Sequence, residues 1–213
     1  MTGRYRRAGR ADERAVPPPE AGQAGADAAL VRAMADGDEG ALARLWAEHA
    51  AALLSYLHGL TGDRFLAEEL LQDSLLAAWR GAAGFRGDAS VRTWLFGIGR
   101  RQAVQRLARS REHPGAVVDD SGLAGLPAAE PGPEAVMLAR SDVAAVRAAM
   151  GELPALHREV LELVFAHGLS VREAARVLGV PDGTVKSRLS NARRSLAAAV
   201  SRSPASARHR TEG

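Results

Sequence analysis

The chain has 213 residues, of which 46% are hydrophobic and 4% aromatic, so it can form one or two domains with cores of leucine, valine and alanine. It has no cysteine, which excludes disulfides and thiolate metal sites, and no stretch approaches the ~20 apolar residues of a membrane span. Because helix-favouring alanine and leucine outnumber β-branched residues, we expect an all-α fold. From the lack of cysteine and of a membrane span we expect a soluble, cytoplasmic protein without membrane insertion.

The net charge of +3 is distributed unevenly along the sequence. Residues 27–79 carry 3 arginines against 9 acidic residues, whereas residues 80–113 carry 8 against 2. Residues 114–156 carry 2 arginines against 6 acidic residues, and residues 157–213 carry 10 basic residues against 5 acidic ones. Acidic and basic blocks thus alternate along the chain. The two basic blocks favour two separate contacts with a polyanion, and the acidic blocks favour at least one face for a different partner.

Residues 1–26 are rich in arginine, proline, glycine and alanine without periodicity, which predicts a disordered basic tail. Helical periodicity starts near Asp27, and we expect a first domain of four helices over residues 27–111. Asp38, Asp63 and Ser90 are placed to cap the second, third and fourth of these helices. Residues 81–88 form a glycine-rich loop between the third and fourth helices, with Phe85 at its centre.

The repeat of apolar residues predicts which face of each helix is buried. On the second helix these residues are Leu42, Leu45, Trp46, His49, Leu53, Tyr56, Leu57 and Leu60. On the third helix they are Leu66, Leu70, Leu71, Leu75, Ala78 and Trp79. On the fourth helix they are Val91, Leu95, Ile98, Val104 and Leu107.

Periodicity is lost over residues 112–133, which predicts a flexible linker between two helical domains. It resumes in a second domain over residues 134–200. Helices are expected there over residues 134–150, 154–166, 171–178 and 181–200. Residues 201–213 are expected to form a second disordered tail.

The segment SVREAARVLGVPDGTVKSRLSNARRSL, residues 170–196, predicts a helix-turn-helix. Its turn lies at Gly179-Val180, and Pro181 starts the second helix. One face of that helix repeats apolar residues and should be buried, namely Val185, Leu189, Ala192 and Leu196. The rest carries groups able to contact phosphates or base edges, unless it is an ordinary solvated helix face. The residues predicted to bind duplex DNA are Thr184, Lys186, Ser187, Arg188, Ser190, Asn191 and Arg194.

Segments of both domains resemble one family. EAARVLGVPDGTVKSRLSNAR, residues 173–193, closely resembles the promoter-reading domain of bacterial sigma factors of the extracytoplasmic-function (ECF) group. LTGDRFLAEELLQDSLLAAWR, residues 60–80, is similar to the family's core-polymerase-binding helix, and FRGDASVRTWLFGIGRRQAVQRLAR, residues 85–109, to its loop and helix for the minus-10 element. The resemblance covers about residues 30–109 and 134–198. It implies a promoter-specificity subunit of RNA polymerase.

The resemblance also implies roles for individual residues. A stretch matching the polymerase-binding helix contains Glu68, Glu69, Gln72 and Asp73. An acidic face opposite a leucine stripe suits a basic protein partner, although a solvated face remains an alternative. The loop around Phe85 matches the place where the family captures a flipped base, while Phe85 could equally plug the domain core. The residues expected at the minus-10 element are Phe85, Arg86, Arg92, Arg100, Arg101 and Arg106.

The chain departs from the family pattern at a few of these positions. Arg101 stands where members commonly have asparagine, and Gln105 where they have an acid. Ser190 and Asn191 replace a pair that is often larger or basic. The resemblance therefore indicates where DNA is read but does not supply the promoter sequence. The partners it implies are core RNA polymerase, promoter DNA and an anti-sigma protein.

Two other function classes fit less well. An enzyme is not expected, because the six histidines show no ligand spacing and no glycine-rich phosphate loop follows a strand. We accordingly expect no cofactor and no metal site. A helix-turn-helix regulator that acts without core polymerase is the remaining alternative, and the acidic helix around Glu68 and the loop around Phe85 argue against it.

Overall fold

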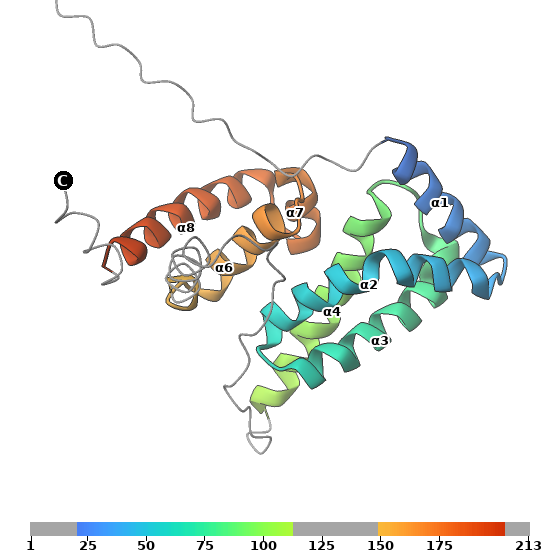
Figure 1. The fold of residues 1–213 in the computed structure, drawn as a ribbon, viewed down its shortest axis with the longest axis horizontal. Helices are drawn as coiled ribbons and strands as arrows, with labels where there is room; N and C mark the ends of the chain where they lie inside the picture. The colour runs from blue at the N-terminus through green and yellow to red at the C-terminus, as the bar shows by residue number, and fades with distance from the viewer. Residues whose placement is uncertain (1–20, 113–148, 203–213) are drawn as a thin grey trace, which may run out of the picture.

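The computed structural model describes residues 21–112 and 149–202, and every regular element in these ranges is helical, as Figure 1 shows. The all-α prediction is confirmed. Residues 1–20, the predicted linker from residue 113 onward, most of the helix expected over residues 134–150, and residues 203–213 lie outside the described ranges. The elements are α1 (Ala21–Ala35), α2 (Glu39–Thr61), α3 (Arg64–Gly81), η1 (Ala82–Gly84), α4 (Val91–Glu112), α6 (Ala155–Leu161), η2 (Glu162–Ala166), α7 (Val171–Leu178) and α8 (Asp182–Arg202).

Helices α1 to α4 pack together into the first domain, and their starts follow from the predicted caps. Asp38 accepts hydrogen bonds from the amides of Gly40 and Ala41, and Asp63 accepts them from the first amides of α3. The Ser90 hydroxyl accepts one from the Thr93 amide at the start of α4. Helix α1 begins at Ala21, six residues before the expected start at Asp27.

The predicted inner faces of the helices are largely buried. Leu45, Leu53, Tyr56 and Leu57 of α2 are almost fully excluded from solvent. Leu70, Leu71 and Leu75 of α3 are also buried, and Leu66 is half-buried. Two predictions are wrong: Trp46 is exposed, and Val104 of α4 is 47% exposed. The helical repeat predicts which stripe of a helix is apolar, but how much of that stripe is buried depends on the helices packed against it.

Two glycines of α4 offer a matched pair for testing how tightly α4 packs on α2. A Cβ atom at Gly99 would lie 3.0 Å from Cδ1 of Leu53 and 3.3 Å from Cδ2 of Leu57, whereas one at Gly97 would meet nothing within 4 Å. We expect Gly99→Ala to lower the free energy of unfolding by about 1–3 kcal/mol through overpacking. Gly97→Ala should raise it by about 0.5–1 kcal/mol through helix propensity. Urea unfolding checks both, and equal effects would contradict the packing.

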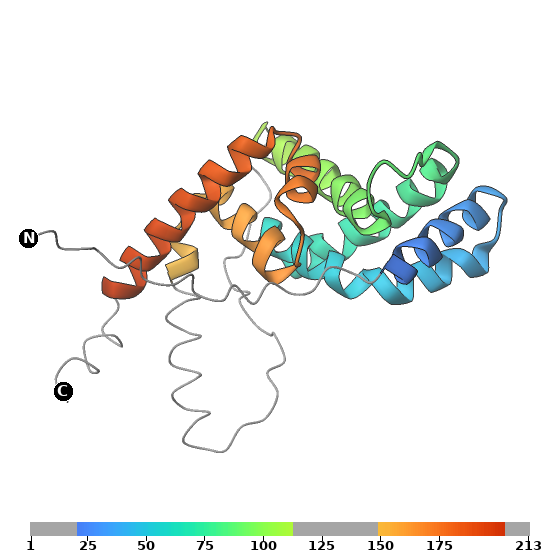
Figure 2. The same cartoon turned by 90° about the horizontal axis from the view of Figure 1, so that it is seen from above.

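The second domain packs directly against the first. Helices α6, η2, α7 and α8 form a small bundle in which α8 lies along α6 and follows α7 through a short turn. Helix α7 contacts α4, and η2 contacts α2, so the two domains share a face (Figures 1 and 2). The expected helix over residues 154–166 is split, because its last turn is a π-helix over Glu162–Ala166.

Within residues 21–112 and 149–202, no helix combines the length and the apolar character that crossing a bilayer requires.

Candidate functional site

The helix-turn-helix geometry at α7 and α8 is set by local capping. Ser170 and Glu173 form a reciprocal capping box at the start of α7. Gly179 ends α7 in the left-handed region, with φ 66°, where glycine costs least. The predicted inner face of α8 is confirmed: Val185, Leu189 and Ala192 are buried, and Leu196 is half-buried.

Burial of that face turns the predicted DNA-contacting side chains of α8 outward. Thr184 and Arg188 are half-buried, and the other five are exposed. The Ser187 hydroxyl donates to the Thr184 carbonyl at 2.9 Å, and Arg194 donates to Oδ1 of Asn191 at 2.5 Å. The exposed residues are Lys186, Ser187, Ser190, Asn191 and Arg194.

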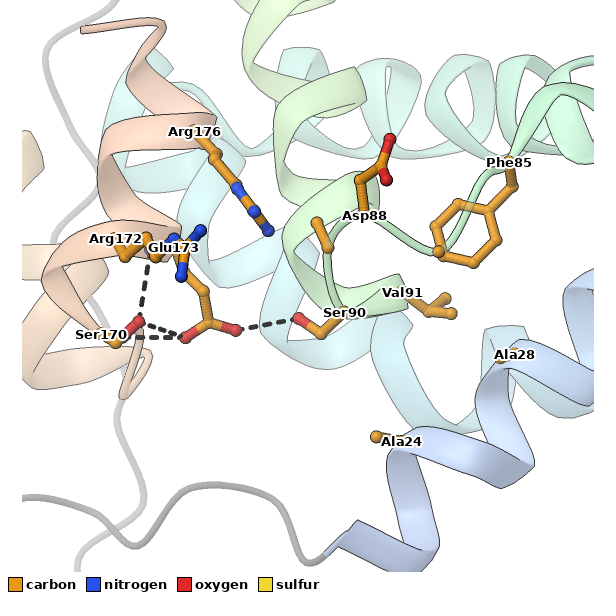
Figure 3. A pocket seen from close by; sticks show the side chains of 12 residues that line it. Ala24, Ala28, Phe85, Asp88, Ser90, Val91, Ser170, Arg172, Glu173 and Arg176 are labelled. Atoms are coloured by element: carbon orange, nitrogen blue, oxygen red, sulfur yellow. Dashed lines mark hydrogen bonds between the residues drawn. The ribbon is translucent and has the colours of Figure 1, made fainter. Parts of the chain in front are cut away.

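The glycine-rich loop lies beside α7 rather than in open solvent. Phe85 is half-buried with its ring centroid 5.0 Å from that of Trp94. It also lines a hollow of about 440 Å³ between the two domains, which Figure 3 shows from close by. Arg172 and Arg176 of α7 stand across this hollow, and Ala24 and Ala28 of α1 complete its lining. Phe85 therefore packs against Trp94 on one side and lines the accessible hollow on the other.

The arginines of the predicted minus-10 surface do not share one face. Arg86 and Arg101 are exposed, and exposed Arg106 lies 3.4 Å from Glu69 of α3. Arg92 lies over the Phe96 ring at 5.6 Å, and burial lowers the pKa of its guanidinium despite the opposing charge of Glu173. Arg100 contacts the second domain. Two of the predicted DNA contacts, Arg92 and Arg100, thus face protein in this arrangement.

A buried polar contact joins the domains around Glu159 of α6. The Tyr56 hydroxyl donates to Oε1 of Glu159 at 2.9 Å, and Nε of Arg100 donates to the same oxygen at 2.7 Å. Burial opposes the charge on Arg100, but its hydrogen bond and attraction to Glu159 raise the pKa of the guanidinium. Burial and Glu159 both raise the pKa of Tyr56. Both partners of Glu159 are distant in the sequence, so no local motif predicts this contact.

A second polar contact joins the start of α4 to the start of α7. The hydroxyl of Ser90 donates to Oε1 of Glu173 at 3.0 Å, while Ser170 donates to the other oxygen (Figure 3). The Thr93 hydroxyl also donates to Oε1 of Glu173, at 3.1 Å. Burial alone would raise the pKa of Glu173, but the hydrogen bonds from Ser170, Ser90 and Thr93 outweigh it and lower that pKa. Glu173, which is part of the capping box of α7, therefore also joins α7 to the first domain.

Glu162 makes the stability of the protein depend on pH. A Cβ atom at Gly59 of α2 would lie 2.6 Å from Oε2 of Glu162, so this carboxyl lies against the first domain. Burial, together with the charge of Glu159 and against that of Arg158, raises the pKa of Glu162 to about 7. The folded state then holds a proton that the unfolded state releases, so stability falls as pH rises from the ordinary carboxyl pKa to about 7. Buried His167, with a pKa of about 4, gives the opposite slope below its ordinary value.

We expect Glu162→Gln to raise the free energy of unfolding by about 2 kcal/mol at pH 8 and to change it little at pH 5. The glutamine carries no charge that burial can penalise. Denaturant unfolding of both proteins at each pH checks this, because the contribution of His167 is common to both. A difference independent of pH would contradict the role of the Glu162 charge.

The acidic face of α3 includes two large apolar residues that sequence reasoning missed. Glu69, Gln72 and Asp73 are exposed, and Glu68 is half-buried beside Arg64. The residues missed are Phe65, 84% exposed, and Leu76, 51% exposed. Positions 65, 69, 72 and 76 are spaced by four, three and four residues, so these side chains share one face of α3, opposite the buried leucines. The helical repeat alone could therefore have placed Phe65 and Leu76 on the exposed face.

Comparisons with known proteins agree with this architecture. The family model "Sigma-70 region 2" matches residues 45–113, and "Sigma-70, region 4" matches residues 144–196. The ECF RNA polymerase sigma factor SigM of Mycobacterium tuberculosis is 37% identical over 174 residues, which are 80% of this chain and 83% of SigM. The chain belongs to the ECF sigma factor family. The sigma factor CnrH of Cupriavidus metallidurans is 35% identical over 178 residues, 81% of this chain and 93% of CnrH.

Solved sigma factors share the fold. CnrH in complex with the cytosolic domain of CnrY has a TM-score of 0.59 and 28% identity, covering 81% of this chain and 96% of CnrH. The sigma factor RpoE in complex with the anti-sigma factor NepR from Bartonella quintana has a TM-score of 0.57 and 30% identity, covering 72% and 92% of the chains. In this sigma factor, the region 2 match covers most of α2 together with α3, η1 and α4, and the region 4 match covers α6, η2, α7 and most of α8.

Proposed function

We propose that this sigma factor binds core RNA polymerase through the exposed face of α3 and directs initiation at promoters. The loop around Phe85 and α4 read the minus-10 element, and α8 docks on the duplex at the minus-35 element. The observation that carries the proposal is the match to both sigma regions, in order, on two packed helical domains. The exposed polar and basic side chains of α8 support the DNA contact.

A regulator that acts without polymerase is not favoured, because the region 2 match includes α3 with its exposed acidic and apolar side chains. The role we infer is that of a non-enzymatic initiation factor in the cytoplasm. We also infer an anti-sigma partner. In support, the solved RpoE from Bartonella quintana is bound to the anti-sigma factor NepR.

Promoter reading requires the two domains to separate. Glu159 accepts hydrogen bonds from Nε and Nη2 of Arg100 at 2.7 and 3.4 Å, so its carboxylate occupies the place that a DNA phosphate would take on this guanidinium. The hydrogen bonds of Ser90 and Thr93 to Glu173 hold the minus-10 loop beside α7 in the same way. DNA or polymerase must therefore replace these contacts, and the packed arrangement corresponds to a form that is not engaged on a promoter.

Run-off transcription tests the function. Core polymerase with this protein should initiate from a set of start sites that core polymerase alone does not use, and the protein alone should produce no transcript. A library of genomic fragments supplies promoters whose sequence need not be specified in advance. Start sites that are the same with and without the protein would refute the proposal.

Lys186→Ala should weaken binding to a promoter duplex about tenfold and reduce the slope of log K against log salt by about 1, because a phosphate contact is lost. Lys186 is exposed on α8, so folding should be unaffected. Arg44→Ala is the control, since Arg44 is an exposed cation on α2. Fluorescence anisotropy with the holoenzyme measures both, and equal losses for the two variants would contradict the assignment.

A further inference from the structure

The hollow beside Phe85 is built from both domains. One wall is the glycine-rich loop with the start of α4, and the opposite wall is α7 (Figure 3). A hollow of about 440 Å³ has the size of a small-molecule site, and such sites are common where two domains meet. The proposed DNA contacts leave the α7 side of this hollow without a role.

Arg172 and Arg176 supply the positive charge of the hollow. They lie four residues apart on α7, so their side chains share one face of the helix, and both are exposed. In the described part of the chain, neither guanidinium has an ion-pair or hydrogen-bond partner. Two neighbouring like charges without a partner repel each other, so an anion that contacts both is favourable.

Two carboxylates also line the hollow, but they leave its α7 side positive. Glu173 accepts four hydrogen bonds, which hold its carboxylate in place and offset its charge. The donors are the amide and the hydroxyl of Ser170 and the hydroxyls of Ser90 and Thr93. Asp88 is exposed, so water and salt screen its charge. A bound anion therefore meets two guanidinium groups that no carboxylate has neutralised.

The loop side of the hollow is aromatic and apolar. The Phe85 ring packs against Trp94 at a centroid distance of 5.0 Å, which fixes its position, and it also lines the hollow. Ala24, Ala28 and Val91 add small apolar side chains beside it. A nucleobase stacks on such a ring, and the stacking tolerates any base because every base has a π-face.

We propose that this hollow binds a nucleoside polyphosphate, with the phosphates on Arg172 and Arg176 and the base against Phe85. Guanidinium groups suit phosphate because each presents a planar fork of donors to two oxygens. The two halves of the site belong to different domains, so the ligand binds only while the domains are packed together. It acts as an effector rather than as a cofactor, because it holds the sigma factor in the form that is not engaged on a promoter.

The regulatory effect rests on the proposed function, whereas binding to the hollow does not. Coupling between two ligands is reciprocal. ATP should therefore weaken binding of single-stranded minus-10 DNA to the isolated sigma factor, and this DNA should weaken ATP binding by the same factor. If ATP and the DNA bind independently, the effector role is wrong. If the chain binds no ATP but still directs run-off transcription, the nucleotide site is wrong and the proposed function stands.

Calorimetric titration of the full chain with ATP tests the site, and adenosine and tripolyphosphate test its two halves. We expect one ATP per chain and weaker binding of either half alone. Arg172→Ala and Arg176→Ala should each weaken binding of ATP and of tripolyphosphate about tenfold, because each removes a charge-assisted contact. Phe85→Leu keeps an apolar side chain but removes the ring. It should weaken ATP binding and leave tripolyphosphate binding unchanged.

Arg44→Ala is the matched control for the two arginines of α7. Arg44 is also exposed, but it lies on α2 outside the hollow, so this variant should bind ATP like the unmodified chain. Arg172 and Arg176 are exposed, so their variants should keep the melting temperature of the unmodified chain. The proposal is overturned if the unmodified chain binds no ATP at one per chain, if Arg44→Ala loses as much affinity as Arg172→Ala, or if Phe85→Leu weakens tripolyphosphate binding as much as ATP binding.

Discussion

Glu159→Ala is expected to lower the free energy of unfolding by about 3 kcal/mol and to separate the two domains. Breaking a buried ion pair leaves its partner charged and desolvated, which costs about 3–5 kcal/mol. We expect the lower end of this range, because the Arg100 side chain is 21% exposed and water can solvate part of its charge, whereas that of Glu159 is 7% exposed. Tyr56 also loses its acceptor. Urea unfolding measures the stability, and small-angle X-ray scattering measures the separation as a larger radius of gyration.

Glu69→Ala is the matched control for this experiment. It removes the acid of an exposed pair with Arg106, and exposed pairs contribute about 0–1 kcal/mol. Release of Arg100 should also raise the affinity of the isolated sigma factor for single-stranded minus-10 DNA by more than Glu69→Ala does, because the Arg106 side chain is already exposed whereas that of Arg100 is largely covered. If Glu159→Ala destabilises no more than Glu69→Ala and leaves the scattering unchanged, Glu159 does not hold the domains together.

Leu76→Asp should weaken binding to core RNA polymerase at least ~30-fold and reduce run-off transcription accordingly. Burying the exposed Leu76 side chain against a partner gains about 1.5–3 kcal/mol, and an aspartate in its place loses that gain. Phe65→Ser should act in the same direction, because Phe65 is the most exposed large apolar residue in the described part of the chain. Binding is measured by titration of labelled protein with core polymerase.

Val104→Asp is the control for these changes on α3. Val104 is also about half exposed, but it lies on α4 rather than on the proposed polymerase surface. Leu76→Asp should leave the melting temperature and the affinity for a minus-35 duplex intact, because Leu76 is outside the core. If the control weakens polymerase binding as much as Leu76→Asp, the face of α3 is not the contact.

The sequence alone determined where most of the helices start and which family the chain belongs to. Helix starts depend on hydrogen bonds within four residues, so Asp38, Asp63 and Ser90 could be recognised as caps. The buried face of α8 follows from a 3.6-residue repeat, which is also local. Motifs in both domains likewise identified the family, because its pattern is contiguous along α3, α4 and α8.

Only the tertiary structure decided which charged groups meet. Glu159 lies 103 residues from Tyr56 and 59 from Arg100, and no local pattern marks it as buried. Arg100 was predicted as a DNA contact from its charge and its helix, but Glu159 on α6 gives it a protein partner in this arrangement. The pairing of Asp27 with His49 arises in the same way, from the packing of α1 on α2. The helical repeat predicts which face of one helix is apolar. The burial and the ionic partner of a charged side chain depend instead on the helix packed against it, which is set by the packing of the whole chain.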